Sequence, residues 1–102
     1  MKKLIANREI EVNEEGYLVD FQQWDKEICE CIADECNVVM SEKHWEVVEY
    51  LQDKHKSEEP LSIRGIKRSG VINIKEFYNL FPGGPLKVST KIAGIPKPKS
   101  CI

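Results

Sequence analysis

Cysteine is the residue type that gives this chain its chemistry. Cys101 is the residue before the last, and the stretch before it is rich in proline, glycine and lysine, which is typical of an extended segment. A thiol at the tip of such a segment can be delivered into another protein's active site, where its thiolate acts as a nucleophile. This arrangement favours a carrier, or a substrate of other enzymes, over an enzyme with its own pocket.

The other three cysteines, Cys29, Cys31 and Cys36, have the spacing C-x-C-x4-C. A structural zinc or iron–sulfur site needs four ligands, usually supplied by loops or tight knuckles. Here the three cysteines lie in a segment with helical periodicity, where Cys29 and Cys36 share one face and Cys31 points elsewhere. The pattern favours Cys29 and Cys36 as small core residues, so neither a metal nor another cofactor is expected.

The elements that position these thiols are predicted to be mostly helical. Turn residues at Asn7-Arg8 lie between two short apolar segments and predict an N-terminal β-hairpin. Helical periodicity and start signals predict helices over residues 21–36, 42–56, 60–67 and 74–80. The N-caps expected for the first, second and fourth are Asp20, Ser41 and Asn73, and Pro60 fits the first position of the third.

These elements predict a mostly α fold, a small orthogonal helical bundle with an N-terminal β-hairpin and a flexible C-terminal arm. The hairpin and helices would form one domain over residues 1–81, and the arm that carries Cys101 would span residues 82–102. Extended from Pro85, such an arm could reach up to about 50 Å.

Composition restricts the range of functions. The chain has 102 residues, a net charge of −2 and no apolar run of membrane length, so a single cytoplasmic domain with reduced thiols is expected. The acidic balance argues against nucleic-acid binding as the main role, and no direct DNA binding is expected. From residue 63 onward, however, eight Lys or Arg face one acid, Glu76. This basic third could steer the arm toward an acidic or phosphate-bearing partner, or form a solvated face.

Several sequence blocks point to one family. The most specific are Leu80-Phe-Pro-Gly-Gly-Pro-Leu-Lys and, at the C-terminus, Lys91-Ile-Ala-Gly-Ile-Pro-Lys-Pro-Lys-Ser-Cys-Ile. Glu14-Glu-Gly-Tyr-Leu, Gln23-Trp, His44-Trp-Glu-Val-Val and, more loosely, Pro60-Leu-Ser-Ile-Arg precede them in the family's order. Together they resemble the TusE/DsrC family of sulfur-relay proteins. The segment between Arg64 and Phe77 is shorter than in typical members, and the cluster of three cysteines is an addition.

The resemblance implies a role for Cys101 as a sulfur carrier, in which the thiol holds sulfur transiently as a persulfide. Members that serve dissimilatory sulfite reductase have a second arm cysteine, and this chain has Thr90 there. Two arm cysteines are needed for a disulfide within the arm, so the resemblance favours the TusE-like branch. Its members receive sulfur from an upstream donor complex and pass it to the enzyme that thiolates tRNA.

A second interpretation stays open beside the carrier. The chain could be a DsrC-like interaction or regulatory protein associated with dissimilatory sulfite reductase, with Cys101 as a redox sensor and without the two-cysteine cycle. In either case the protein works as a relay or binding partner more than as an autonomous enzyme. His44, Arg64 and Lys91 are the candidates to hold the arm or a partner, although a histidine beside Trp45 at a helix start also fits a purely structural role.

Overall fold

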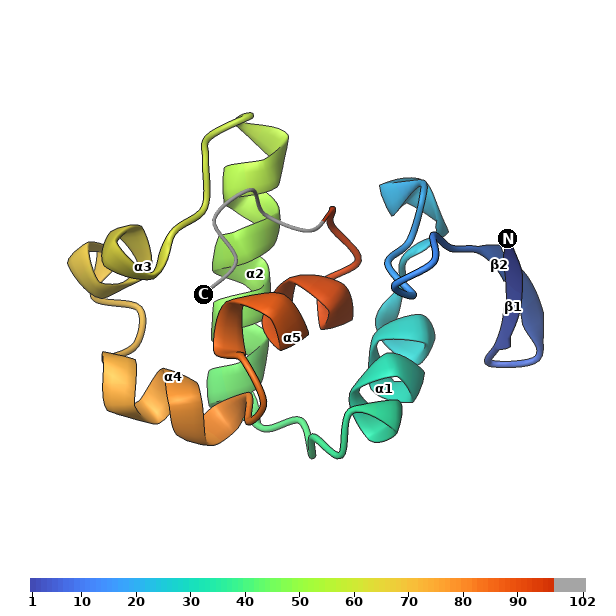
Figure 1. Ribbon diagram of the computed structural model, residues 1–102. Coiled ribbons are helices and arrows are strands. Elements are labelled where there is room, and N and C mark those ends of the chain that lie inside the picture. The colour runs from blue at the N-terminus through green and yellow to red at the C-terminus, as the bar shows by residue number, and fades with distance from the viewer. Residues whose placement is uncertain (97–102) are drawn as a thin grey trace.

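The computed structural model describes residues 1–96. It contains a two-stranded hairpin followed by a short 3-10 turn and five α-helices (Figure 1). In chain order the elements are β1 (Lys2–Ile5), β2 (Arg8–Glu11), η1 (Phe21–Gln23), α1 (Lys26–Glu35), α2 (Glu42–Lys56), α3 (Ile63–Ser69), α4 (Ile74–Leu80) and α5 (Pro85–Ile92). The predicted fold class, a helical bundle that begins with a hairpin, is confirmed.

The predicted hairpin is present, but its turn lies one residue earlier than predicted, because Arg8 is the first residue of β2. Strands β1 and β2 pair antiparallel, with Lys2 opposite Glu11 and Ile5 opposite Arg8. The two turn residues, Ala6 and Asn7, both have positive φ, which matches the right-handed twist of the strands they connect.

Capping residues fix where the helices begin. The predicted helix over residues 21–36 is divided, because Asp20 caps only the η1 turn and Asp25 then caps α1 by accepting a hydrogen bond from the Ile28 amide. Helices α2 and α4 begin where predicted, after Ser41 and Asn73. The third helix was predicted from Pro60 but begins after Ser62, whose hydroxyl accepts the Gly65 amide at 3.0 Å.

The largest correction concerns the predicted arm. Residues 85–92, expected to be extended, form helix α5, whose Leu86 and Ile92 are fully buried. The proline and glycine residues before it end α4 and start α5, with Pro85 at the first turn, where a missing amide costs nothing. The predicted boundary at residues 81 and 82 therefore lies inside the packed domain.

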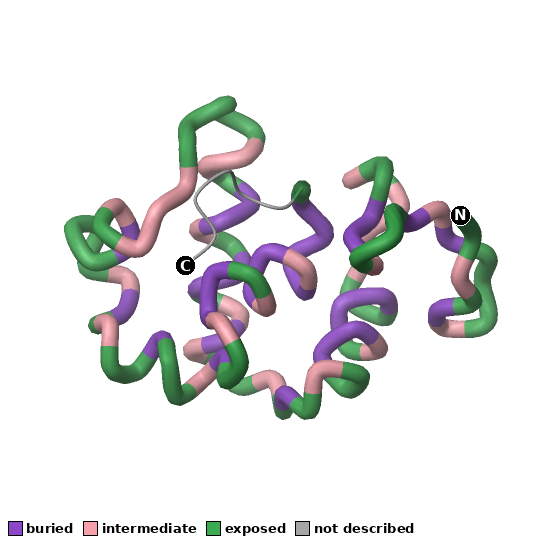
Figure 2. Tube along the Cα trace, in the orientation of Figure 1, coloured by how far each residue is buried: buried purple, intermediate pink, exposed green. Residues whose placement is uncertain are grey.

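Helix α5 is the centre of the core. Figure 1 shows it between α1 and α2, and it packs on both of these helices and on α4. Figure 2 shows that its turns are mostly buried, and Ala93 and Ile95 after it are buried as well. None of the helices in residues 1–96 is both long and apolar enough to cross a membrane. The core thus holds the chain in place up to Ile95.

Candidate functional site

Helix α5 and the residue that follows it are held by three side chains from other parts of the fold. The Tyr17 hydroxyl donates to the Lys87 carbonyl, the Trp24 indole Nε1 to the Ile92 carbonyl, and the Gln52 amide Nε2 to the Ala93 carbonyl, each at 2.9 Å. Carbonyls in the last turn of a helix have no partner within the helix, and here side chains satisfy two of them. The end of α5 is therefore positioned by the hairpin side of the molecule and by α2 together.

Gly94 lets Trp24 lie directly against the chain where it leaves α5. Its φ is +74°, in the left-handed region, and a Cβ atom there would lie 2.4 Å from Cδ1 of Trp24. Only glycine combines this backbone conformation with so close a contact. The chain then passes through buried Ile95 to exposed Pro96, the last residue before the C-terminal segment, which we define as residues 97–102.

Cys101 lies outside the described residues. It follows Pro96 by five residues, so a fully extended chain would place it up to about 17 Å from that proline. This reach is about a third of the predicted one, because residues 85–95 are packed in the core.

His44 is a structural residue in the described fold. Its ring is 5% exposed, and its Nδ1 accepts the Ser41 backbone amide at 3.1 Å while its Nε2 lies 2.9 Å from the Leu80 carbonyl. Since Nδ1 is the acceptor, Nε2 carries the proton and donates it to that carbonyl. The ring also packs edge-on against Phe81. His44 thus ties the start of α2 to the connection between α4 and α5.

Lys91 lies on α5 beside the hairpin end of the molecule. Its ammonium group is 5.9 Å from the centre of the Tyr17 ring, within range of a cation–π interaction. Its side chain also passes Gly16 and lines a polar cavity of about 150 Å³ together with Lys3, Glu35 and Cys36.

Arg64 is exposed on α3. His44, Arg64 and Lys91 therefore lie on three different helices, and no hydrogen bond or ion pair within residues 1–96 joins any two of them. Their proposed docking roles stay predictions.

The three internal cysteines differ in their surroundings. Cys29 is fully buried, and burial raises the pKa of its thiol to about 12. Cys36 is half-buried, and burial raises its pKa too, against the opposing effect of Lys91. Cys31 is half-buried on another part of the helix surface. Over residues 1–96 no group of three or more His, Cys, Asp and Glu side chains is arranged to hold a metal ion.

One known protein family matches almost the whole chain. The sequence profile of the family described as "DsrC like protein" matches residues 4–102, which includes Cys101. The chain belongs to the DsrC-like family. The resemblance seen in the sequence blocks is thereby confirmed.

Individual relatives cover nearly the full length. The chain is 36% identical over 107 residues to "Sulfurtransferase TusE" of Escherichia coli K12, covering 97% of this chain and 98% of that protein. It is 34% identical to the protein of the same name from Photorhabdus laumondii, covering 97% and 96%. Among solved structures, dissimilatory sulfite reductase I (DsrI) is similar with a TM-score of 0.87 and 31% identity, and oxidised DsrC from Archaeoglobus fulgidus with 0.80 and 27%. In both cases the similarity covers 100% of this chain and 100% of the chain in the solved structure.

Thr90, where the resemblance implies a second arm cysteine in some family members, lies inside α5. It is fully buried, and its hydroxyl donates to the Leu86 carbonyl of its own helix at 2.7 Å. The hydroxyl is therefore satisfied within the core.

Sequence reasoning missed the side chains that anchor α5. Gln52 lies on the buried face of α2, beside Val48 and Leu51. A glutamine on such a face signals a buried hydrogen bond, because a buried amide needs a partner. The partner itself, the Ala93 carbonyl, could not be read while residues 85–95 were assigned to an extended arm.

Proposed function

We propose that this protein is a sulfur carrier that accepts sulfur on Cys101 and hands it to a partner enzyme. The observation that carries this proposal is the full-length similarity to sulfurtransferases named TusE, within a family match that extends through Cys101. The packing of α5 supports it as well, because it holds the chain in place through Ile95, six residues before Cys101.

The proposed chemistry is two successive exchanges at sulfur. The Cys101 thiolate attacks the terminal sulfur of a donor persulfide, the donor's S–S bond breaks, and the donor leaves as a thiolate. Cys101 then holds the sulfur as a persulfide. An acceptor cysteine attacks the outer sulfur, the S–S bond on Cys101 breaks, and the Cys101 thiolate is regenerated. Neither step needs a resident cofactor or an external oxidant, because each bond formed replaces one broken.

The names of the relatives support a place in a sulfur relay. We propose an upstream donor protein complex and a downstream enzyme that thiolates tRNA, as the TusE-like resemblance implies. A reducing cytoplasm would keep the thiols of this chain available for such exchanges. Thr90 supports the single-cysteine version, because no second thiol is present at that position to close a disulfide with Cys101.

The second candidate is a DsrC-like partner of dissimilatory sulfite reductase. The observation that favours it is the structural likeness to DsrI and to oxidised DsrC from Archaeoglobus fulgidus. In this version Cys101 responds to oxidants and pairs with another chain or with a half-buried cysteine such as Cys31. Non-reducing gels under mild oxidant, with Cys101→Ser and Cys31→Ser as variants, would detect that pairing.

The deciding experiment is intact-protein mass spectrometry after incubation with a cysteine desulfurase, cysteine and the upstream relay proteins. We expect a gain of one sulfur atom that a reductant removes, in the wild type and not in Cys101→Ser. Cys36→Ser is the matched control, since it removes a half-buried thiol and leaves Cys101 in place. Equal gain by Cys101→Ser and wild type would contradict the carrier function.

A further inference from the structure

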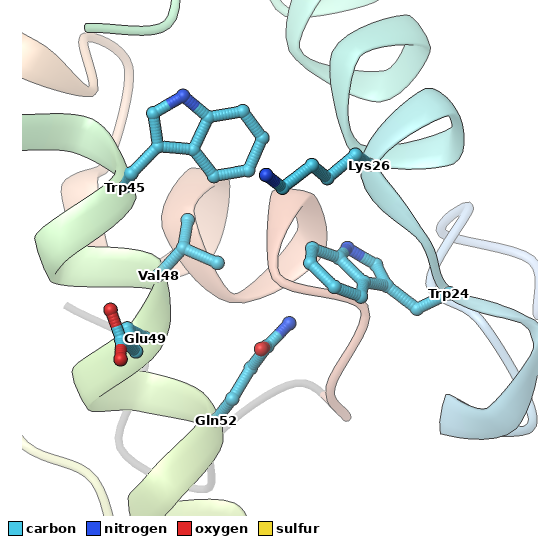
Figure 3. Close-up of a pocket in the computed structure, with 6 residues that line it drawn as sticks. All are labelled: Trp24, Lys26, Trp45, Val48, Glu49 and Gln52. Atoms are coloured by element: carbon cyan, nitrogen blue, oxygen red, sulfur yellow. The ribbon is translucent and has the colours of Figure 1, made fainter. Parts of the chain in front are cut away.

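A cleft on the domain surface lies beside the base of the C-terminal segment. It has a volume of about 290 Å³ and runs between α1 and α2, with α5 behind it (Figure 3). We call it the tryptophan cleft, because its two half-buried indoles face each other across it. Its lining residues are Trp24, Lys26, Trp45, Val48, Glu49 and Gln52.

The cleft exposes aromatic surface that the fold itself does not cover. Lys26 extends between the indoles, with its ammonium group 5.8 Å from the centre of the Trp45 ring. Beyond Trp24 the aromatic surface continues, since Phe21 stacks on Trp24 and meets His55 edge-on. Residues that dominate binding energy at protein interfaces are enriched in Trp, Tyr and Arg and lie in well-packed, desolvated pockets. The cleft can therefore accept one apolar side chain from another molecule.

One edge of the cleft is acidic. Four acidic residues of α2 lie on one face of that helix, because they are spaced four, three and four residues apart: Glu42, Glu46, Glu49 and Asp53. Of these, Glu49 lines the cleft. All four carboxylates are exposed, and within residues 1–96 only Glu46 among them has an ion-pair partner, Lys43 at 3.9 Å. Across the cleft, Lys26 is the single basic lining residue.

Two lining residues also fix the point where the C-terminal segment begins. Trp24 holds the Ile92 carbonyl and contacts Gly94, and Gln52 holds the Ala93 carbonyl. A molecule seated in the tryptophan cleft thus lies next to the base of the segment that carries Cys101. Docking there would keep the reacting sulfur within the short reach of that segment and raise its effective concentration.

From this chemistry we infer that the tryptophan cleft is the docking site for the protein that charges Cys101 with sulfur. The partner presents an apolar side chain that packs against the exposed parts of Trp24 and Trp45, flanked by Lys or Arg residues that pair with the acidic face of α2. This inference rests on the proposed carrier function and adds the surface that function uses.

The test compares two routes of sulfur delivery to Cys101. The purified relay proteins with desulfurase and cysteine require docking, whereas sodium tetrasulfide delivers a sulfane sulfur without a protein surface. In the latter reaction the Cys101 thiolate takes one sulfur and a shorter polysulfide leaves. The reference rate with tetrasulfide therefore reports the reactivity of Cys101 alone.

Trp45→Ala and Glu49→Lys are the cleft variants, and Tyr78→Ala and Glu14→Lys are their matched controls. Tyr78 is an exposed aromatic residue on α4, and Glu14 is an exposed carboxylate in the turn after β2. We expect each cleft variant to slow charging by the relay proteins at least tenfold at subsaturating concentration, about 1.4 kcal/mol of lost binding. The controls should charge at the wild-type rate. Glu49→Lys keeps the test valid if Trp45→Ala unfolds, because Glu49 is exposed.

Each other outcome overturns the inference in a distinguishable way. Wild-type charging by both cleft variants, with Cys101→Ser inactive, would leave the carrier function standing and remove the docking site. Slower charging of the cleft variants by tetrasulfide, to the same extent as by the relay proteins, would show that the substitutions lower the reactivity of Cys101 itself, and the docking site would be removed. Equal charging of Cys101→Ser and wild type would refute the carrier function, and the docking site would fall with it.

Discussion

Replacing Gly94 with alanine should damage the fold through one contact. The new Cβ atom would lie 2.4 Å from Cδ1, 2.8 Å from Cγ and 2.9 Å from Cβ of Trp24, distances that real Cβ atoms do not occupy. The indole would have to move, and its hydrogen bond to the Ile92 carbonyl would be lost with it. The effect should therefore exceed the ordinary cost of placing alanine at positive φ.

The expected loss can be divided into two parts. Left-handed backbone costs an alanine about 1–2 kcal/mol. Displacement of Trp24 and loss of its hydrogen bond add about 2–3 kcal/mol. The free energy of unfolding of Gly94→Ala, measured by urea denaturation, should thus fall by about 3–5 kcal/mol, a large share of the ~5–15 kcal/mol typical of a domain.

Gly70→Ala is the matched control, because it shares the backbone conformation and lacks the contact. Gly70 has φ +76°, close to the +74° of Gly94, and nothing lies within 4 Å of its would-be Cβ atom. Its loss should be about 1–2 kcal/mol, the backbone part alone. Equal losses in the two variants would refute the reasoning, because the contact with Trp24 would then contribute nothing.

Three further predictions concern buried and capping side chains. His44→Ala removes the partners of the Ser41 amide and the Leu80 carbonyl, so urea denaturation should show a loss of about 1–3 kcal/mol, and an unchanged midpoint would contradict this. The pKa of Asp25 is lowered by the Ile28 amide and by Arg8, so its stabilisation is complete above the ordinary carboxyl range and is lost as the pH falls through the lowered pKa. Asp25→Asn should therefore flatten the acid side of the stability profile, and an unaltered slope would argue against it. Burial raises the pKa of Cys29 to about 12, so iodoacetamide at pH 8 should leave Cys29 unmodified in the native protein and modify it in urea. Peptide mass spectrometry measures the modification of Cys29 under both conditions. Equal modification in the native protein and in urea would contradict the burial of Cys29.

Local signals in the sequence were enough to place most elements. The start of α2 after Ser41 and the start of α4 after Asn73 follow from capping preferences that act within a few residues. The start of α1 was harder to predict from the sequence, because Asp20 and Asp25 are both good N-caps and only the packing decides which one starts the long helix.

Helix α5 could not be predicted for a different reason. Its eight residues are flanked by proline and glycine on both sides, which locally favours an extended segment. Its stability comes from tertiary contacts, since Leu86 and Ile92 are fully buried and side chains from distant elements satisfy its carbonyls. Such contacts depend on residues that lie as many as 70 positions apart in the chain.

The burial of α5 changes how a carrier of this kind would have to work. A long free arm could search for a partner's active site from a distance, but residues 85–95 are packed in the core and five residues lie between Ile95 and Cys101. Within the proposed function, this short length restricts transfer to partners that dock close to the base of the segment. A shorter segment also loses less conformational entropy when its thiol is positioned for attack. Selectivity between sulfur donors would then depend on the domain surface around Trp24 and Gln52 more than on the sequence of the segment itself.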